Sequence, residues 1–210
     1  EHAFSPEVRG SPRFVPARAI LRDVDQFDAE FFGMRAREAE LTDPQHRLLL
    51  ECGWAALEDG GYDPSRYSGA IGVFAGCSMN TYLLASVLAD RAPAESFASD
   101  YQVGSYETLM GALGDTLATR LAYKLNLRGP AMTVQSACST SLLAVAQACQ
   151  SLLLYQSDMA LAGGVSITFP QKRGYLHQEG GMVSSYGVCR PFDALASGTV
   201  FADGGAKVLP

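Results

Sequence analysis

The sequence predicts a layered α/β domain, because short apolar runs of strand length alternate with longer segments of helical periodicity. Residues 131–137 and 159–167 are such runs, and residues 139–155 between them have the apolar spacing of a helix. A strand, a helix and a strand joined by short connections favour parallel pairing. The helix is so apolar that we expect it to be covered on most sides. Residues 70–76, bounded by glycines, are predicted to be a further buried strand.

A capped helix is predicted before that strand. Asp43 is a suitable N-cap, Pro44 occupies the first helical position, where its missing N–H costs nothing, and the glycine pair at 60–61 ends the helix. Apolar residues recur at helical spacing between these limits. The chain before Asp43 is predicted to be an irregular lead-in over about residues 1–21 and a short helix at residues 27–32.

The remaining segments are predicted from their periodicity and their turn residues. We expect a helix at residues 81–91, a surface loop at residues 92–104, and a helix at residues 105–127 that is interrupted near Gly111 and Gly114. After the strand at 159–167, we expect a loop at residues 175–193 and a strand at residues 199–209 that is interrupted at residues 203–205.

Composition excludes several classes of protein. The chain has 210 residues, 48% of them hydrophobic, which is enough for a substantial core. Its net charge is -6, and it has no run of Lys or Arg, so we expect neither nucleic acid nor an anionic membrane as a partner. The start of the chain is polar and lacks the features of a secretory signal. No segment approaches the roughly 18 consecutive apolar residues of a membrane span. We therefore expect a cytoplasmic protein.

The cysteines do not have the spacing of a disulfide framework or a zinc site. Their number is odd, they are far apart, and no C-x-x-C pair occurs. Nucleotide-binding glycine motifs and the H-E-x-x-H motif are also absent. The sequence thus predicts no metal and no directly bound cofactor. The five cysteines are Cys52, Cys77, Cys138, Cys149 and Cys189.

Cys138 is the candidate nucleophile, because it lies at the predicted junction between a strand and the apolar helix. The N–H groups and the positive dipole end of a helix N-terminus stabilise a thiolate and can hold an oxyanion. The flanking Ser136, Ala137, Ser139 and Thr140 are small and leave room for a substrate. Position alone leaves a second interpretation open, since strand-to-helix turns also contain inert, buried cysteines.

The other cysteines are predicted to have structural roles. Cys149 and Cys52 fall on apolar helical faces and are expected in the core. Cys77 follows the strand at 70–76 and could lie near a site, but no neighbour in the sequence activates it. Cys189 lies in a loop beside Arg190, where packing is the favoured interpretation.

The histidines and the nearby acids are weaker candidates. His46 is expected on the surface or in a packing role, and His2 in a frayed terminus. His177, in a glycine-rich loop, could approach a cleft. Asp193 and Asp203 are interpreted as solvated or structural acids and not as catalytic groups.

The stretch V-Q-S-A-C-S-T-S-L at residues 134–142 resembles the active-site signature of modular polyketide β-ketoacyl synthases. Further matches to that family occur in the family's order and extend the resemblance over about residues 22–205. They are F-D-A-E-F-F at 27–32, D-P-Q-H-R-L-L-L-E at 43–51, W-A-A-L-E-D at 54–59 and G-V-C-R-P-F-D at 187–193.

The resemblance implies an incomplete thiolase-like layered α/β/α fold, with residues 1–210 as the N-terminal catalytic portion and an active-site strand, turn and helix at about 131–155. It implies a homodimer that works beside other polyketide synthase domains. The substrates would be carried on the phosphopantetheine of an acyl carrier protein. Cys138 would accept an acyl group, and decarboxylation of a malonyl-type extender would then drive a Claisen condensation.

The sequence departs from the family pattern at several positions. Gln135 and Ser136 stand where Asp-Thr is usual, Tyr186 stands where an acid is expected, and Lys207 falls in a strand expected to be hydrophobic, which suggests an altered chain end. The family's two catalytic histidines and its supporting lysine belong to a C-terminal half. We therefore expect a fragment that does not catalyse condensation alone.

Two alternative functions stay open at this stage. A thiolase-like enzyme could use Cys138 for acyl transfer without condensation. A non-catalytic subunit could shape a pocket or support a partner, although such members generally lack the cysteine. Residues 117–127, with Arg120 and Lys124 among apolar residues, could form part of a dimer interface or an ordinary amphipathic helix.

Overall fold

The computed structural model describes residues 4–89, 95, 97–99 and 106–208. Its centre is a four-stranded sheet in the order β3-β2-β4-β6. The first three of these strands are parallel, and β6 runs antiparallel to β4 at the edge. The strands are β2 (Ile71–Cys77), β3 (Ala131–Thr133), β4 (Met159–Ser166) and β6 (Gly204–Val208).

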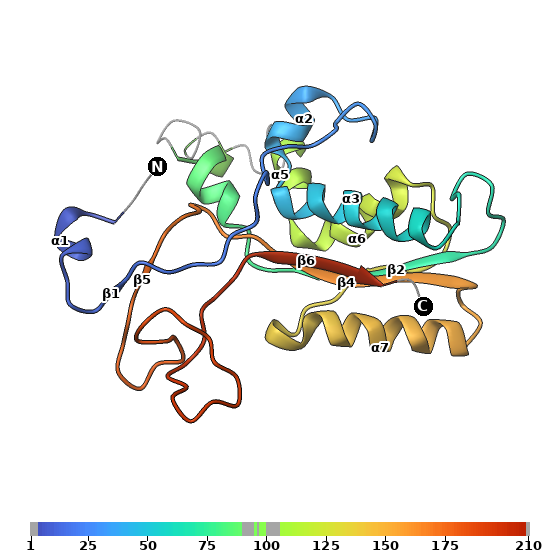
Figure 1. The fold of residues 1–210 in the computed structure, drawn as a ribbon. Coiled ribbons are helices and arrows are strands. Elements are labelled where there is room, and N and C mark those ends of the chain that lie inside the picture. Colours follow the sequence, from blue (N-terminus) through green and yellow to red (C-terminus); the bar gives the residue numbers. More distant parts are fainter. Residues whose placement is uncertain (1–3, 90–94, 96, 100–105, 209–210) are drawn as a thin grey trace.

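Helices cover both faces of this sheet, which confirms the predicted layered α/β/α fold. Helices α3 (Pro44–Asp59) and α6 (Leu117–Lys124) lie on one face, and α7 (Thr140–Leu153) lies on the other (Figure 1). The smaller elements are α1 (Pro6–Arg9), α2 (Ala36–Leu41), η1 (Leu83–Val87), α5 (Tyr106–Ala112), η2 (Gly114–Thr116) and η3 (Ala137–Ser139). A two-stranded sheet joins β1 (Phe14–Val15) to β5 (Tyr175–Leu176).

The α3 helix begins and ends where its sequence predicts. An oxygen of the Asp43 side chain accepts a hydrogen bond from the Gln45 N–H at 2.9 Å, Pro44 is the first helical residue, and Gly60 follows the last turn. The helix packs against α6 and the sheet, and this contact buries Leu49, Leu50 and Leu57. Its N-terminus is held near the carboxyl end of β2, because the Ser78 hydroxyl donates a hydrogen bond to Gln45.

The strands predicted at 131–137 and 159–167 are parallel, as expected, but a third strand lies between them. Strand β2 lies between β3 and β4 and pairs in parallel with both, so β3 and β4 are parallel to each other but are not neighbours. Almost all of β2 is buried, which explains its central place. Strand β3 ends at Thr133, four residues before the predicted end of that strand.

Three other predicted elements differ from the structure. Residues 27–32 form turns and not a helix, because the Asp28 side chain accepts a hydrogen bond from the Phe31 N–H at 3.0 Å and the rings of Phe27 and Phe32 stack. The predicted helix at 81–91 is helical only to Val87, with a π turn, and residues 90–91 lie outside the described part. Of the strand predicted at 199–209, only Gly204–Val208 forms a strand, β6, which begins within the expected interruption, while Thr199 and Ala202 form isolated bridges.

The long helix predicted at 105–127 is divided into α5, η2 and α6, which confirms the interruption near Gly111 and Gly114. The surface loop predicted at 92–104 lies mostly outside the described residues. Its described members, residue 95 and residues 97–99, are helical. No helix in the described part of the chain is long and apolar enough to cross a membrane.

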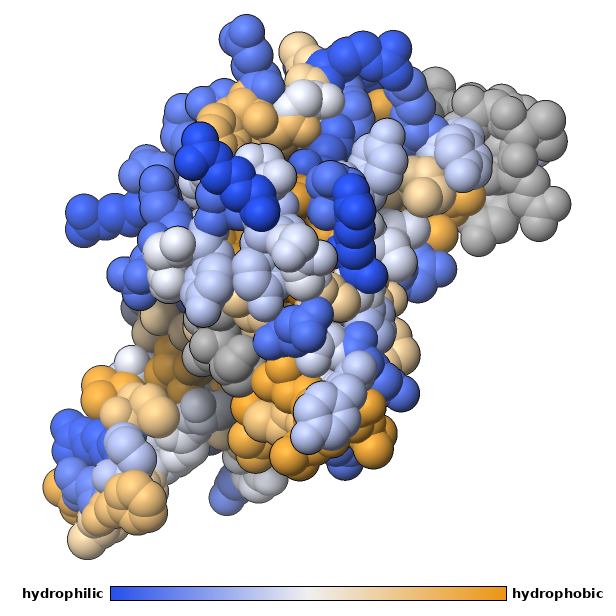
Figure 2. Space-filling model, turned by 90° about the vertical axis from the view of Figure 1, so that its right-hand side faces the viewer, coloured by the Kyte–Doolittle hydropathy of each residue, from blue (hydrophilic) through white to orange (hydrophobic). Residues whose placement is uncertain are grey.

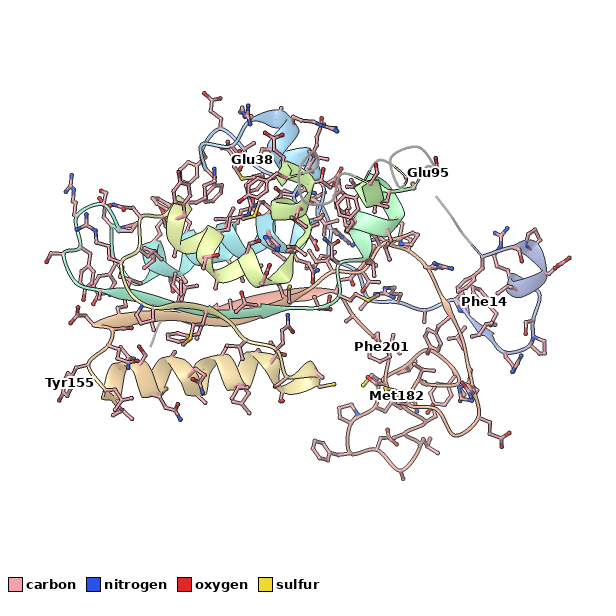
Figure 3. The ribbon with its side chains drawn as sticks, turned by 180° about the vertical axis from the view of Figure 1, so that it is seen from behind. Phe14, Glu38, Glu95, Tyr155, Met182 and Phe201 are labelled. Carbon is pink, nitrogen blue, oxygen red and sulfur yellow. The ribbon has the colours of Figure 1, made fainter. Side chains whose placement is uncertain are left out.

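The prediction that the apolar helix is covered on most sides is wrong for this chain. The face of α7 that carries Ala144 and Ala148 packs on β2 and β4, but its outer face is exposed, and Cys149 lies there and not in the core. The physical reason is that, among the described residues, only the sheet packs against α7, so the face of the helix that points away from the sheet is left uncovered. Figure 2 shows apolar residues gathered at its C-terminal end, and Figure 3 shows Tyr155 pointing away from the sheet there.

His46 is an uncharged group enclosed in the α3 layer. Its side chain is almost fully buried, and neither ring nitrogen has a hydrogen-bond partner among the described residues. Burial, with a smaller contribution from the positive charge of Arg120, lowers the pKa of His46 to about 3. The predicted packing role of His46 is therefore confirmed, and protonation of this imidazole opposes folding.

We predict that His46 makes the chain sensitive to acid. The unfolded chain binds a proton at His46 below about pH 6.5 and the folded chain only near pH 3, so folding stability falls as the pH drops through this window. Relative to His46→Gln, the free energy of unfolding of the wild type should decrease by up to about 1.4 kcal/mol per pH unit. Urea unfolding at a series of pH values measures this, and a constant difference between the two proteins would contradict it.

Candidate active site

Cys138 lies in the short turn that leads into α7, as predicted from the sequence. The turn is η3, and the side chain of Cys138 is exposed. Ser139 N–H donates to the Ser136 carbonyl at 3.2 Å, and Ser136 N–H donates to the Thr140 hydroxyl at 2.9 Å. Ala137 has a φ of +51°, a left-handed conformation that is unusual for alanine. The thiol is thus presented by a turn that is held from both ends.

The end of β2 packs directly against this turn. A Cβ atom on Gly76 would lie 2.1 Å from the Val134 carbonyl oxygen and 2.2 Å from a methyl carbon of Thr140. No side chain fits at that distance, so only glycine allows the segment before Cys138 to approach the strand. On the neighbouring strand, a Cβ on Gly164 would lie 3.2 Å from that of Ser141. Small residues at two strand ends therefore fix where α7 begins.

Cys138 faces a cavity of about 650 Å³ at the carboxyl ends of the parallel strands. Parallel α/β sheets commonly bind ligands at this end. The lining comes from the end of β2, from the turn before α7, from β4 and from the start of β6. It consists of residues 76–79, Gln135, Ala137, Cys138, Thr140, Ser141, residues 164–166 and residues 204–206.

The cavity contains a second cysteine in a different environment. Cys77 is half-buried, and burial, with a smaller effect of the Asp43 carboxyl, raises the pKa of its thiol to about 11. Gln135 donates a hydrogen bond from its amide to the Cys77 carbonyl at 3.0 Å. The sequence interpretation that nothing activates Cys77 agrees with this environment, since its thiol remains protonated at neutral pH.

The departures from the family pattern have defined places. Gln135 ties the active-site turn to the end of β2, and the Ser136 hydroxyl hydrogen bonds to that of Ser139 at 2.6 Å. Tyr186 donates its hydroxyl to the Leu195 carbonyl, and Arg190 lies over its ring. The backbone of Lys207 belongs to β6 and pairs with Gly163. Gln135, Ser136 and Tyr186 are thus accommodated by local contacts.

The histidines and Asp193 do not join Cys138. His177 contacts the Val183 carbonyl through Nδ1 at 3.2 Å and does not line the cavity. His46 is enclosed in the α3 layer, and His2 lies outside the described residues. Asp193 is exposed in a loop and accepts from the Leu195 N–H. Among the described residues, no group of three His, Cys, Asp or Glu side chains could hold a metal ion.

Asp203 is a structural acid that supports the cavity wall. It is buried, and its carboxylate accepts hydrogen bonds from Arg18 at 3.1 Å, from the Thr168 N–H at 3.0 Å and from Gln171 at 3.2 Å. The next residues, Gly204 and Gly205, line the Cys138 cavity. The sequence interpretation of Asp203 as a structural acid is therefore confirmed, but its three partners and the role of Gly76 were not predicted. The available signals were the place of Gly76 at the end of the strand predicted at 70–76 and the place of Asp203 beside the glycines at 204–205.

Another cavity, of about 760 Å³, lies beside the C-terminal end of α3 and is lined partly by Phe31, Trp54 and Tyr62. It contains carboxylates and a lysine, but no cysteine or histidine. Its one lysine, Lys124, already contacts the Gly33 carbonyl and Glu38. The Cys138 cavity is therefore the better candidate for covalent chemistry.

An α/β/α fold with a thiol at the start of a helix, facing a cavity at the strand ends, is an arrangement typical of enzymes that use a cysteine nucleophile. Residues 4–210 match the family described as "Beta-ketoacyl synthase, N-terminal domain". The chain belongs to this family and is the N-terminal ketosynthase domain of a modular polyketide synthase, which confirms the resemblance predicted from the sequence.

Known proteins support this assignment in sequence and in structure. The chain is 46% identical, over 98% of its length, to a phenolphthiocerol/phthiocerol polyketide synthase protein of Mycobacterium tuberculosis. It is 43% identical, over 97%, to a mycocerosic acid synthase-like polyketide synthase of Mycolicibacterium smegmatis. Ketosynthase twelve of the bacillaene polyketide synthase of Bacillus amyloliquefaciens superimposes with a TM-score of 0.84 at 32% identity over 99% of this chain.

The chain is short compared with these proteins. It spans 14% of the Mycobacterium tuberculosis protein, 9% of the Mycolicibacterium smegmatis protein and 35% of the bacillaene ketosynthase chain. The fold match therefore concerns the part of a ketosynthase that carries the strand, turn and helix at Cys138.

We predict that the two cysteines of the cavity differ in reactivity. At pH 7.5 Cys138 should react with iodoacetamide at least about tenfold faster than Cys77, because the thiolate is the nucleophile and Cys77 is held as a buried thiol. Mass spectrometry of tryptic peptides after timed alkylation measures both rates. The same reaction in urea is the control, where the difference should vanish. Equal rates in the folded protein would contradict the prediction.

Proposed function

We propose that Cys138 accepts an acyl group as a thioester and that the parent enzyme joins this group to a malonyl-type extender. The observation that carries the proposal is an exposed thiol at the start of α7 that faces a cavity of about 650 Å³. Within the described part of the chain, no other cysteine combines exposure with a place on that cavity.

The first step is acyl transfer from the phosphopantetheine of an acyl carrier protein. The Cys138 thiolate attacks the thioester carbonyl, a C–S bond forms, and the pantetheine thiolate leaves and takes up a proton. N–H groups in the first turn of a helix can stabilise the oxyanion of the tetrahedral intermediate. The turn before α7 and the small residues around Cys138 support this geometry.

The second step is decarboxylative condensation. Loss of CO₂ from the malonyl-type extender gives a carbanion equivalent, which attacks the Cys138 thioester. A C–C bond forms, the C–S bond breaks, and the Cys138 thiolate is released, while the chain on the carrier is longer by two carbons. Among the described residues, His46 is buried and His177 lies outside the cavity, so we infer that groups of the parent enzyme other than these histidines transfer the protons of this step. We expect the isolated chain to be inactive in condensation.

The proposed partners are the acyl carrier protein, the other domains of the synthase and a second copy of the ketosynthase. In α6, Leu117 and Leu121 are buried against the sheet, which favours the amphipathic-helix interpretation of residues 117–127. Its exposed Tyr123 remains available for contact with a second copy. A cytoplasmic location stays a prediction from the sequence.

We predict that the complete parent protein forms an acyl adduct on Cys138. Incubation with an acyl-pantetheine thioester should add the mass of the acyl group to the peptide that contains Cys138, because its thiol is accessible from the cavity. The variant Cys138→Ala should carry no adduct. Mass spectrometry of the digested protein measures both, and labelling that persists in the variant rejects Cys138 as the acceptor.

A second reaction with the same acylated protein distinguishes condensation from the two alternative functions. After acylation of Cys138, addition of a malonyl carrier protein should release CO₂ and give a product two carbons longer. Normal labelling without CO₂ release would favour acyl transfer without condensation. Absence of any adduct in the wild type would favour a non-catalytic role.

A further inference from the structure

The start of β6 forms one wall of the Cys138 cavity. Gly204, Gly205 and Ala206 line the cavity, so this wall consists of main chain and a single methyl group. A Cβ on Gly204 would meet no atom within 4 Å, so no side-chain packing fixes the first residue of the strand on that side. Apart from the pairing of β6 with β4, the position of the wall therefore depends on what holds the chain just before Gly204.

The Asp203 side chain joins three segments of the chain at that point. It has no exposed surface, and one carboxylate oxygen accepts hydrogen bonds from Arg18 at 3.1 Å and from the Thr168 N–H at 3.0 Å. The other oxygen accepts from the Gln171 amide at 3.2 Å. Arg18 belongs to the segment after β1, whereas Thr168 and Gln171 follow β4. All three bonds require an acceptor, which a carboxylate supplies at both oxygens.

The main chain makes a second link to the N-terminal segment. The Asp203 N–H donates to the Ala19 carbonyl at 3.0 Å, and Ala19 and Ala202 form a parallel bridge. Figure 1 shows the segment between β1 and α2 passing beside the start of β6. This segment contributes no residue to the lining of the Cys138 cavity. It therefore supports the cavity wall from outside.

The ion pair makes this support depend on charge. Arg18 forms no other ion pair with any residue of the described part, and its side chain is only 19% exposed. The Arg18 Nε is buried without a hydrogen-bond partner, so Asp203 is the group that compensates the guanidinium. An amide in place of the carboxylate would turn an NH₂ donor toward other donors and leave a mostly buried cation unpaired. Loss of the carboxylate should therefore displace the start of β6.

The thiol is held by other contacts. Gly76 allows the close approach that fixes the turn before α7, and the Thr140 hydroxyl accepts the Ser136 N–H in that turn. None of the hydrogen bonds of the Asp203 carboxylate involves the turn. A change at Asp203 should therefore move the wall of the cavity and leave the access of a small reagent to Cys138 unaltered.

We propose that Asp203, held by Arg18, is a positioning residue for the reaction of Cys138. It fixes the start of β6, so that residues 204–206 form a wall against which the acyl group of the substrate lies. The inference rests on the proposed function and deepens it, because it names a residue that controls how the acyl group binds. Asp203 supports the wall and does not line the cavity, so its effect falls on substrate binding and not on the chemical step.

The test uses the complete parent protein and an octanoyl-pantetheine thioester. In the variant Asp203→Asn, the thioester concentration that half-saturates acylation of Cys138 should rise by about tenfold, because the acyl group loses its wall, while the maximal rate should change by less than about twofold. Mass spectrometry of the peptide that contains Cys138 measures both quantities. Alkylation of Cys138 by iodoacetamide should keep its wild-type rate, since this reagent is too small to need the wall. General damage to the fold would change both reactions.

A double-mutant cycle assigns the effect to the ion pair. Arg18→Met should raise the half-saturating concentration, and Arg18→Met/Asp203→Asn should raise it no further than Asp203→Asn alone, because the pair is already broken. Arg18→Lys keeps a cation and should give a value between those of the wild type and Arg18→Met. Arg18→Met also tests the pair if Asp203→Asn does not fold. The matched control, Arg37→Met/Glu40→Gln, removes an ion pair of 3.3 Å whose side chains are 70% and 67% exposed, and it should leave each value within about twofold.

Alkylation by N-octyl iodoacetamide separates this inference from the proposed function, because alkylation requires no acyl transfer. In Asp203→Asn this reagent should react more slowly than in the wild type, while iodoacetamide does not. An unchanged half-saturating concentration, an equal slowing of both iodoacetamides, or additive effects in the cycle would each overturn Asp203 as a positioning residue. A wild type that reacts with the octyl reagent but accepts no acyl group contradicts the proposed function and leaves the alkylation comparison valid.

Discussion

The contact between the end of β2 and the turn before α7 is the constraint on which the rest of the site depends. Gly76 has no side chain, so the Val134 carbonyl and the Thr140 methyl group can approach the strand more closely than any Cβ would allow. Thr140 in turn accepts the hydrogen bond that holds the Ser136 N–H. The result is a turn that presents Cys138 at the open end of a parallel sheet, where its thiol faces a cavity and not the core.

The two cysteines of that cavity show how burial separates a nucleophile from a structural thiol. Cys77 lies at the end of a buried strand, near the Asp43 carboxyl, and both features favour its neutral form. Cys138 lines the same cavity but is exposed on a turn. Asp203 supports the wall of the Cys138 cavity through its partly buried ion pair with Arg18.

Local signals made much of this architecture predictable. The Asp43-Pro44 start of α3, the apolar runs that became β2 and β4, and the small residues around Cys138 each depend on neighbours in the chain. The order of the strands was not predictable, because it depends on which apolar run is buried on both faces. The exposure of Cys149 was also missed, since the apolar outer face of α7 looks the same in sequence as a covered one. The role of Asp203 depends on Arg18, 185 residues away.

The acylation rate of Cys138 in the variant Gly76→Ala tests the central claim most directly. The complete parent protein would react with an acyl-pantetheine thioester, with Gly10→Ala as the matched control, since an added Cβ there meets no atom closer than 3.4 Å. Circular dichroism would establish that both variants are folded. We predict a fall of about tenfold or more for Gly76→Ala, because a small displacement of a nucleophile is costly, and a near wild-type rate for the control. A folded Gly76→Ala variant that is acylated as fast as the wild type would contradict the account.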